Sequence, residues 1–152
     1  PASMEGIDRT KGAFTMGFSL FINFDGDCRQ AVDFYAHAFD SEVQGLMTFS
    51  EMPPNPTYVV SEEDRDKVMY CSMMIGGTNV MFSYVPSGMP FTRGNSISPV
   101  VSMKKDADVS RAFDRLKAGG TVDMELQTAF WSPLYGMVTD RFGVSWQLMI
   151  DE

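Results

Sequence analysis

The stretch GTVDMELQTAFWSPLYGMVTDRFGVSW, residues 120–146, decides the fold of this chain. Three runs of β-branched and aromatic residues typical of strands occur here, at 121–128, 135–139 and 145–150, and the third continues past the end of the stretch. The last two runs flank a turn at Arg141-Phe142-Gly143. Just before the stretch, Gly119-Gly120 marks the end of a helix by the glycine C-cap rule. That helix is indicated by an apolar stripe at i, i+3, i+4 and i+7: Val109, Ala112, Phe113 and Leu116.

The same order of elements occurs once earlier in the chain. A strand at 19–24 is followed by a helix that begins at Cys28, a strand at 42–49, a loop at 51–67 and a hairpin at 68–84. A strand at 97–103 opens the second copy, and identical residues align the two copies 79 positions apart: Ser19 with Ser98, Phe34 with Phe113, and Val43 with Val122. We therefore expect an α+β fold of two βαβββ modules, at residues 17–85 and 95–151. The modules are expected to share one curved mixed sheet, with helices on its convex face and a concave face free for a ligand.

Composition and charge exclude several classes of protein. The 152 residues are 44% hydrophobic and 12% aromatic, which suits a single domain with a core and not a disordered chain. The net charge of −8 repels phosphate backbones and anionic lipid, so we expect neither nucleic acid nor membrane as a partner. A small apolar or cationic molecule fits this charge better.

The termini and cysteines give weaker signals. Residues 1–14 lack the apolar segment of a secretory signal, so we expect a flexible arm or a cloning remnant, outside a single domain at 15–152. Cys28 and Cys71 form no disulfide framework and are expected to be free thiols in a reducing cytoplasm.

Three segments resemble one known family. Residues 120–146 resemble the C-terminal signature of PhnB-like proteins, which belong to the vicinal-oxygen-chelate superfamily of glyoxalase, bleomycin-resistance and extradiol-dioxygenase domains. The stretch NFDGDCRQAVDFYAHAF at 23–39 resembles the family's first strand, turn and helix, and DKVMYCSMMIGGTNVMFS at 66–83 its central hairpin. The resemblance implies paired βαβββ modules and, commonly, a homodimer.

The resemblance also implies a metal site, and here the sequence departs from the pattern. Superfamily enzymes hold a divalent cation in the concave face with His, Gln and Glu from strands. The only histidine of this chain is His37, in the first helix, and Tyr70 stands where PhnB-like relatives often have His. The metal-binding Glu falls on Gln147, and its counterpart in the first module lies near Val80 or Met81. We therefore predict no metal site and no cofactor.

Some proteins of this branch are called methyltransferases of a quinone pathway. A nucleotide-type cofactor usually needs a glycine-rich loop between a strand and a helix of a parallel sheet. The glycine pairs of this chain, Gly76-Gly77 and Gly119-Gly120, are instead predicted to lie in a hairpin turn and at a helix end. The sequence gives no support for methyl transfer.

Six residues are candidate ligand contacts, and none is assigned a catalytic role. Alternation places Tyr70 and Ser72 on one face of their strand, and Gln147 on the face opposite Trp146 and Leu148. Gln147 is either a polar anchor for a ligand or an interior hydrogen-bonded amide. The other candidates are aromatic residues that either line a pocket mouth or close a core or dimer contact: Phe130, Trp131 and Tyr135.

Neither of the other reactive side chains is expected to act in catalysis. His37 lies beside the apolar stripe of its helix, which indicates a solvated side chain, and Cys71 has no base near it in sequence. Three hypotheses for the function follow. The first is a metal-independent small-molecule binding protein, the second a metal-dependent enzyme of the glyoxalase or dioxygenase type, and the third an interaction domain without a ligand.

Overall fold

The computed structural model describes residues 16–151, so the arm expected at 1–14 lies outside the described residues. Twelve elements follow in order: β1 Leu20–Phe24, α1 Cys28–Ala38, β2 Gln44–Thr48, η1 Phe49–Glu51, η2 Glu62–Asp64, β3 Val68–Ile75, β4 Thr78–Tyr84, β5 Val100–Met103, α2 Asp106–Leu116, β6 Thr121–Ala129, β7 Ser132–Thr139 and β8 Ser145–Ile150. Within this part of the chain, no helix is long and apolar enough to cross a membrane.

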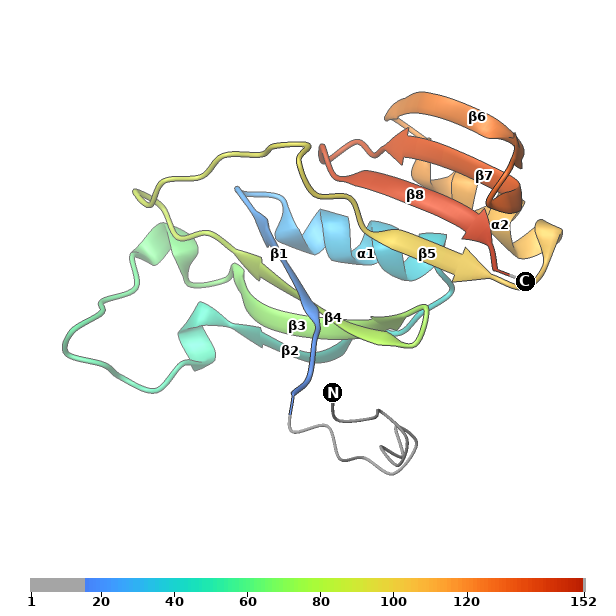
Figure 1. Cartoon of the computed structure of the whole chain (residues 1–152). Helices are drawn as coiled ribbons and strands as arrows, with labels where there is room; N and C mark the ends of the chain where they lie inside the picture. The colour runs from blue at the N-terminus through green and yellow to red at the C-terminus, as the bar shows by residue number, and fades with distance from the viewer. Residues whose placement is uncertain (1–15, 152) are drawn as a thin grey trace, which may run out of the picture.

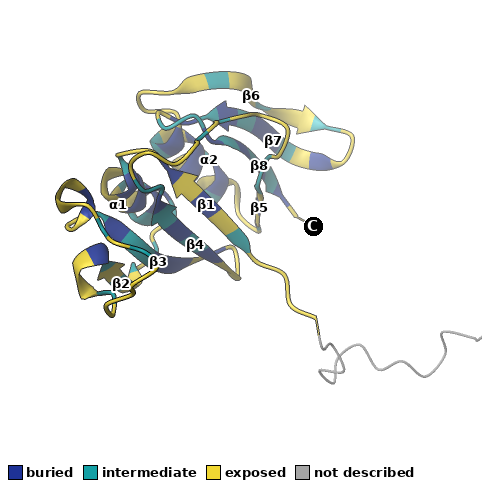
Figure 2. Ribbon diagram, turned by 90° about the vertical axis from the view of Figure 1, so that its left-hand side faces the viewer, coloured by how far each residue is buried: buried dark blue, intermediate teal, exposed yellow. Residues whose placement is uncertain are grey.

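The strands form two four-stranded sheets, ordered β1-β4-β3-β2 and β5-β8-β7-β6 (Figure 1). In each sheet the first strand pairs in parallel with the last strand of its module, and the other pairs are antiparallel. The predicted βαβββ order is therefore confirmed twice. The halves were expected to share one curved mixed sheet, whereas the structure has a separate four-stranded sheet in each module (Figure 2).

The helices cover one face of each sheet. Helix α1 packs on β3 and β4, α2 packs on β5, β7 and β8, and the two helices contact each other (Figure 1). The predicted apolar stripe of α2 is confirmed, because all four of its residues are buried. Burying these stripes against strand residues drives the modules together. The largest fully enclosed side chains come from both modules: Trp146, Tyr35, Phe24, Phe82 and Phe113.

Strand register shows that the modules are structural repeats. Phe21 of β1 pairs with Met81 of β4, and Val100 of β5, 79 residues after Phe21, pairs with Gln147 of β8. Paired residues share a face, so all four side chains lie on the faces away from the helices. Met81 is thus the counterpart of Gln147, one of the two positions that the sequence had left open.

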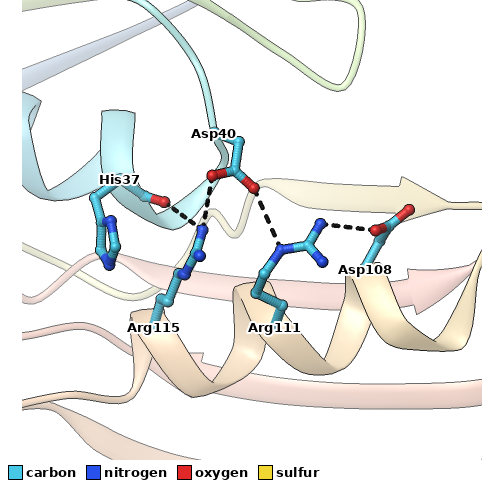
Figure 3. A network of polar contacts seen from close by, with 5 residues as sticks. All are labelled: His37, Asp40, Asp108, Arg111 and Arg115. Carbon is cyan, nitrogen blue, oxygen red and sulfur yellow. Dashed lines mark hydrogen bonds and ion pairs between the residues drawn. The ribbon is translucent and has the colours of Figure 1, made fainter.

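Two aspartates join the modules. The buried Asp140, just after β7, accepts hydrogen bonds from the Tyr35 hydroxyl of α1 at 2.5 Å and from Trp146 Nε1 at 2.8 Å. The exposed Asp40, just after α1, pairs with Arg115 at 2.8 Å and with Arg111 at 3.2 Å, both on α2 (Figure 3). One joint is therefore enclosed in the core and the other lies in solvent.

Two strands begin three residues away from their predicted starts, the largest such differences in the described chain. Strand β5 begins at Val100 and not at 97, because the preceding residues belong to the connection between the modules. Strand β7 begins at Ser132 and not at 135, which leaves Phe130 and Trp131 as the turn after β6. Pro133 obscured this start, since proline is tolerated in a sheet mainly near a strand end.

Candidate functional site

The second sheet brings four of the predicted residues together at its open face. Tyr135 of β7 donates its hydroxyl to Gln147 Oε1 of β8 at 2.5 Å. The Trp131 ring lies edge-on to the Tyr135 ring, with centroids 5.0 Å apart, and Phe130 lies 4.7 Å beyond Trp131. Tyr135 is almost covered, whereas Trp131 is 50% exposed and Phe130 fully exposed. Phe130, Trp131 and Tyr135 therefore form an aromatic edge beside the amide of Gln147.

The hydrogen bond from Tyr135 fixes the orientation of the Gln147 side-chain amide. Its oxygen accepts the hydrogen bond of the tyrosine hydroxyl, so both N–H donors of its Nε2 group are directed elsewhere. No bond from Nε2 to a protein atom is found in residues 16–151. Such an amide can donate to a carbonyl or ether oxygen of a bound molecule while the aromatic side chains stack on its apolar part.

The remaining predicted pair lies on the other sheet. Tyr70 and Ser72 of β3 are on its open face, and Ser72 pairs with Met81. Because Met137 pairs with Gln147 in the same way, Tyr70 occupies in the first module the place that Tyr135 occupies in the second. The structure therefore splits the six predicted residues into two related sets, one on each sheet.

The residues present do not fit the divalent cation of the superfamily. The four related positions are Phe21, Met81, Val100 and Gln147, which offer one neutral amide and no imidazole or carboxylate. Nor do residues 16–151 contain any group of three His, Cys, Asp or Glu side chains that could hold a metal ion. No step of a mechanism is therefore assigned to a metal.

The histidine and the two cysteines, for which the sequence predicts no catalytic role, lie away from both open faces. His37 is exposed on α1, as predicted. Cys71 points to the helix side of β3 and is fully buried, and burial raises the pKa of its thiol to about 11. Burial likewise raises the pKa of Cys28 to about 12. Both thiols stay protonated near neutral pH, which does not suit a nucleophile.

The glycine pairs occupy turns, as predicted. Gly76 and Gly77 adopt φ angles of 57° and 81° between β3 and β4, and Gly119 adopts 77° after α2. Glycine is favoured at each because a Cβ is strained there. The connection from β1 to α1, Asp25-Gly26-Asp27, holds a single glycine, so no glycine-rich phosphate loop is formed.

Two cavities lie under the connection that follows β4. One of about 640 Å³ lies between β1 and residues 85–97, and a second of about 460 Å³ lies on the other side of Arg93. None of the six predicted residues lines either cavity. Residues 86–94 fall between the two predicted modules, and no periodicity or motif distinguishes Arg93 among them.

Asp140 is a second residue that sequence reasoning missed. Besides Tyr35 and Trp146, its carboxylate accepts the backbone N–H groups of Phe142 at 2.8 Å and Val144 at 3.1 Å. An aspartate before a glycine-containing turn is a signal for such backbone bonds. Nothing in the sequence shows that the tyrosine 105 residues earlier completes the set.

Comparison with known proteins identifies one family. A family model described as 3-demethylubiquinone-9 3-methyltransferase matches residues 16–149. Among curated proteins, Protein YjdN of Escherichia coli strain K12 is 28% identical over 142 residues, covering 89% of this chain and 95% of its own length.

Solved structures agree with this match. Protein PA1353 from Pseudomonas aeruginosa superimposes with a TM-score of 0.79 at 26% identity, covering 90% of this chain and 98% of its own. A PhnB protein from Bacillus cereus, a putative 3-demethylubiquinone-9 3-methyltransferase, gives 0.67 at 26% identity over 90% and 100%. A glyoxylase/bleomycin resistance protein/dioxygenase domain from Frankia sp. EAN1pec gives 0.63 at 12% identity over 92% and 100%, a likeness of fold alone.

Proposed function

The chain belongs to the PhnB-like family that the 3-demethylubiquinone-9 3-methyltransferase model describes, and from that premise we propose that it is a metal-independent small-molecule binding protein. The observation that carries the proposal is the Tyr135–Gln147 hydrogen bond beside Trp131, at the strand position where the superfamily places a metal-binding glutamate. An amide held by a tyrosine and flanked by an indole suits a ligand oxygen and an aromatic ring.

The class of ligand is a planar aromatic molecule, either a neutral one that carries a carbonyl oxygen or a cation. The aromatic edge supplies apolar contact, worth about 25 cal/mol per Å² buried, and Gln147 Nε2 supplies a donor. The net charge of −8 disfavours anions over most of the surface, and Asp123, bonded to Thr139 on the same sheet, adds a carboxylate nearby. Quinones fit this description, and the family model's own description refers to a quinone substrate.

Methyl transfer is not part of the proposal. The described chain has no glycine-rich loop for a nucleotide-type cofactor, and both thiols are buried and protonated. The residues on the open faces can bind and orient a molecule, but none of them is a base or nucleophile of altered reactivity.

A second copy of the chain is the proposed partner. Large apolar side chains are exposed on the open faces of both sheets: Phe21, Met47 and Met74 on the first, and Val100, Met124 and Trp131 on the second. Several exposed apolar side chains on the same faces of two sheets are typical of a surface that another molecule covers. A homodimer that apposes these faces would cover them and enclose the ligand. Sedimentation equilibrium at micromolar concentration tests this, and a monomer there contradicts it.

Quenching of tryptophan fluorescence tests ligand binding, because Trp131 is half exposed while Trp146 is 1% exposed. Menadione, a neutral naphthoquinone, and proflavine, a planar cation, are titrated separately. We expect saturable quenching by at least one of them. Calorimetry should show weaker binding of menadione to both Gln147→Ala and Trp131→Ala, whereas proflavine, which has no oxygen atom, should respond to Trp131→Ala alone. Val59→Ala is the matched control, since Val59 is 84% exposed in the loop before η2.

Two results would overturn the proposal. The first is the absence of binding by both probes, or unchanged affinity in both site variants. The second is stoichiometric retention of Mn²⁺, Ni²⁺, Fe²⁺ or Zn²⁺ after purification with each ion and dialysis, which would favour a metal-dependent enzyme of the glyoxalase or dioxygenase type.

A further inference from the structure

The connection between the modules forms a groove. This groove is separate from the aromatic edge of the second sheet. Its cavity of about 640 Å³ lies within the range of small-molecule sites. The walls are fixed at several points. Ser87 donates its backbone N–H and its hydroxyl to the buried Asp64, Val85 N–H bonds to Phe24 O, and Gln147 N–H bonds to Pro99 O. The groove is therefore formed before any ligand arrives.

Arg93 is held rigidly at the side of this groove. Its Nη2 donates to Asn23 O at 2.7 Å, and its guanidinium carbon lies 5.0 Å from the ring centres of both Phe24 and Phe91. The first side-chain carbons pass over Gly143, where an added Cβ would come within 3.1 Å of them. These contacts orient the planar group without using most of its donors.

The hydrogen-bonding capacity of Arg93 is largely unused. Its Nε is enclosed yet has no hydrogen-bond partner, the single such side-chain atom in residues 16–151. Its Nη1 makes no bond to a protein atom within the same residues, and no carboxylate lies within ion-pair distance. Native structures pair nearly all such donors, so an incomplete guanidinium points to a missing acceptor.

The lining of the groove defines that acceptor. Arg93 is its one charged residue, in a chain whose net charge is −8. Around it stand apolar side chains, Phe21, Met89, Phe91 and Ile97 among them. The neutral polar groups Asn23, Ser83 and Ser145 complete the wall. A single cation on apolar walls suits a monoanion with an aromatic or aliphatic body, and not a phosphate, which needs several cations or backbone donors.

We propose that the groove between β1 and residues 85–97 is a second binding site, for an aromatic or other apolar monocarboxylate whose carboxylate accepts hydrogen bonds from Arg93. The carboxylate pairs with the free side of the guanidinium, and the apolar body lies against Phe21 and Ile97. The site takes an anion, whereas the aromatic edge of the second sheet takes a neutral or cationic molecule.

Two isosteric probes test the site by calorimetry: 2-naphthoate, an anion, and 2-naphthamide, its neutral counterpart. We expect the full chain to bind naphthoate about tenfold or more tightly than naphthamide, as one charged hydrogen bond implies. Arg93→Gln should remove that preference and Arg93→Lys should keep part of it. Arg141→Gln is the matched control, because Arg141 also caps an aromatic ring, that of Phe34, but lines neither of the two cavities under the connection.

A second pair of variants avoids the packing of Arg93. Ile97 is 77% exposed at the groove, so Ile97→Glu should fold normally and weaken naphthoate binding by about tenfold through charge repulsion. Val59→Glu adds the same charge at an exposed site outside the groove and should leave the affinity unchanged.

The proposal is overturned if neither probe binds at millimolar concentration, if both bind equally, or if Arg93→Gln and Ile97→Glu retain the affinity of the unaltered chain. Its failure is separate from that of the proposed function, because menadione and proflavine report on Trp131 and naphthoate reports on Arg93.

Discussion

The two modules have the same strand order but differ in the turn between their last two strands. In the first module, β3 and β4 are joined by Gly76-Gly77, and the buried Ile75 precedes the turn. In the second, β7 and β8 are joined by a longer turn in which Asp140 holds the place of Ile75. The first turn only reverses the chain. The second reaches across to the other module, with Asp140 bonded to Tyr35 and Phe142 packed on α1.

This difference shows how a repeat becomes a single domain. Strand pairing is local to each module and is preserved in both copies. The buried contacts between the modules come from a turn in which the two copies differ, through an aspartate and an aromatic residue. The predictions below test that assignment, beginning with the residue that we expect to matter most.

Asp140→Ala should have the largest effect on stability. It leaves four donors without their acceptor: the Tyr35 hydroxyl, Trp146 Nε1 and the N–H groups of Phe142 and Val144. We expect a loss of about 3–5 kcal/mol in the free energy of unfolding, measured by urea denaturation. If this variant does not fold, Asp140→Asn keeps one acceptor oxygen and should show an intermediate loss. A loss below about 1 kcal/mol for both variants would contradict the assignment.

Phe142→Ala should rank second. The Phe142 ring lies 5.6 Å from Phe34, 6.1 Å from Phe24 and 6.1 Å from Tyr35, measured between ring centroids. Since the side chain is only partly buried, we expect about 2–4 kcal/mol, at or below the range for an enclosed phenylalanine. Phe130→Ala is the control on the same module, because that ring is 97% exposed and should cost little. Equal losses in the two variants would show that the turn does not join the modules.

The pH dependence of the free energy of unfolding tests a feature of the first module alone, because both cysteines lie in it. Cys28 and Cys71 have Ala107 and Gly136 as counterparts, and a Cβ at Gly136 would clash with Phe113 at 2.9 Å. Burial raises both thiol pKa values in the folded chain, to about 12 and about 11, above the ordinary value of 9.0. The unfolded chain therefore loses these protons first as the pH rises.

The free energy of unfolding should consequently fall above pH 9, by at most about 1.4 kcal/mol per pH unit for each thiol. Urea denaturation between pH 8 and pH 10 measures the slope. The double variant Cys28→Ala, Cys71→Ala should flatten it. An unchanged slope in that variant would mean that the thiols are already ionised or exposed in the folded chain.

The related tyrosines should differ by a smaller amount. Tyr135 donates to Gln147, whereas no hydrogen-bond partner of the Tyr70 hydroxyl is found in residues 16–151. Tyr135→Phe should therefore cost about 1 kcal/mol and Tyr70→Phe close to nothing. Thermal unfolding of the two variants side by side makes the comparison. A larger cost at Tyr70 would indicate that the open face of the first sheet is the more ordered of the two.

How far the sequence predicts this molecule depends on the range of each interaction. Both helices, both hairpins and the repeat follow from local periodicity and glycine turns. The arrangement as two sheets does not, because it depends on contacts such as Tyr35 with Asp140. Nothing in the local sequence around Tyr35 shows that its hydroxyl bonds to a residue of the other module. Arg93 was not predicted as a site residue for the same reason, since its partners Asn23 and Phe24 lie about 70 residues earlier in the chain.

Asp40→Asn should have the smallest effect of these substitutions. Asp40 joins α1 to Arg111 and Arg115 of α2, but its carboxylate is exposed and its ion pairs are weakened by water and salt (Figure 3). Asparagine also tolerates the positive φ of 49° at this position, so the backbone is not strained. Hydrogen bonding from Arg115 lowers the pKa of Asp40, and the stabilisation is therefore present at neutral pH and lost on acidification.

We expect a small decrease in the melting temperature at low salt that 1 M NaCl abolishes. Asp114→Asn is the matched control, because Asp114 pairs with Lys117 on its own helix and joins nothing across the modules. If Asp40→Asn destabilised the chain as much as Asp140→Ala, the solvent-exposed pair of helices and not the buried turn would be the principal joint. The position of the joint matters for function, because the β7–β8 turn leads directly into the strand that carries Gln147.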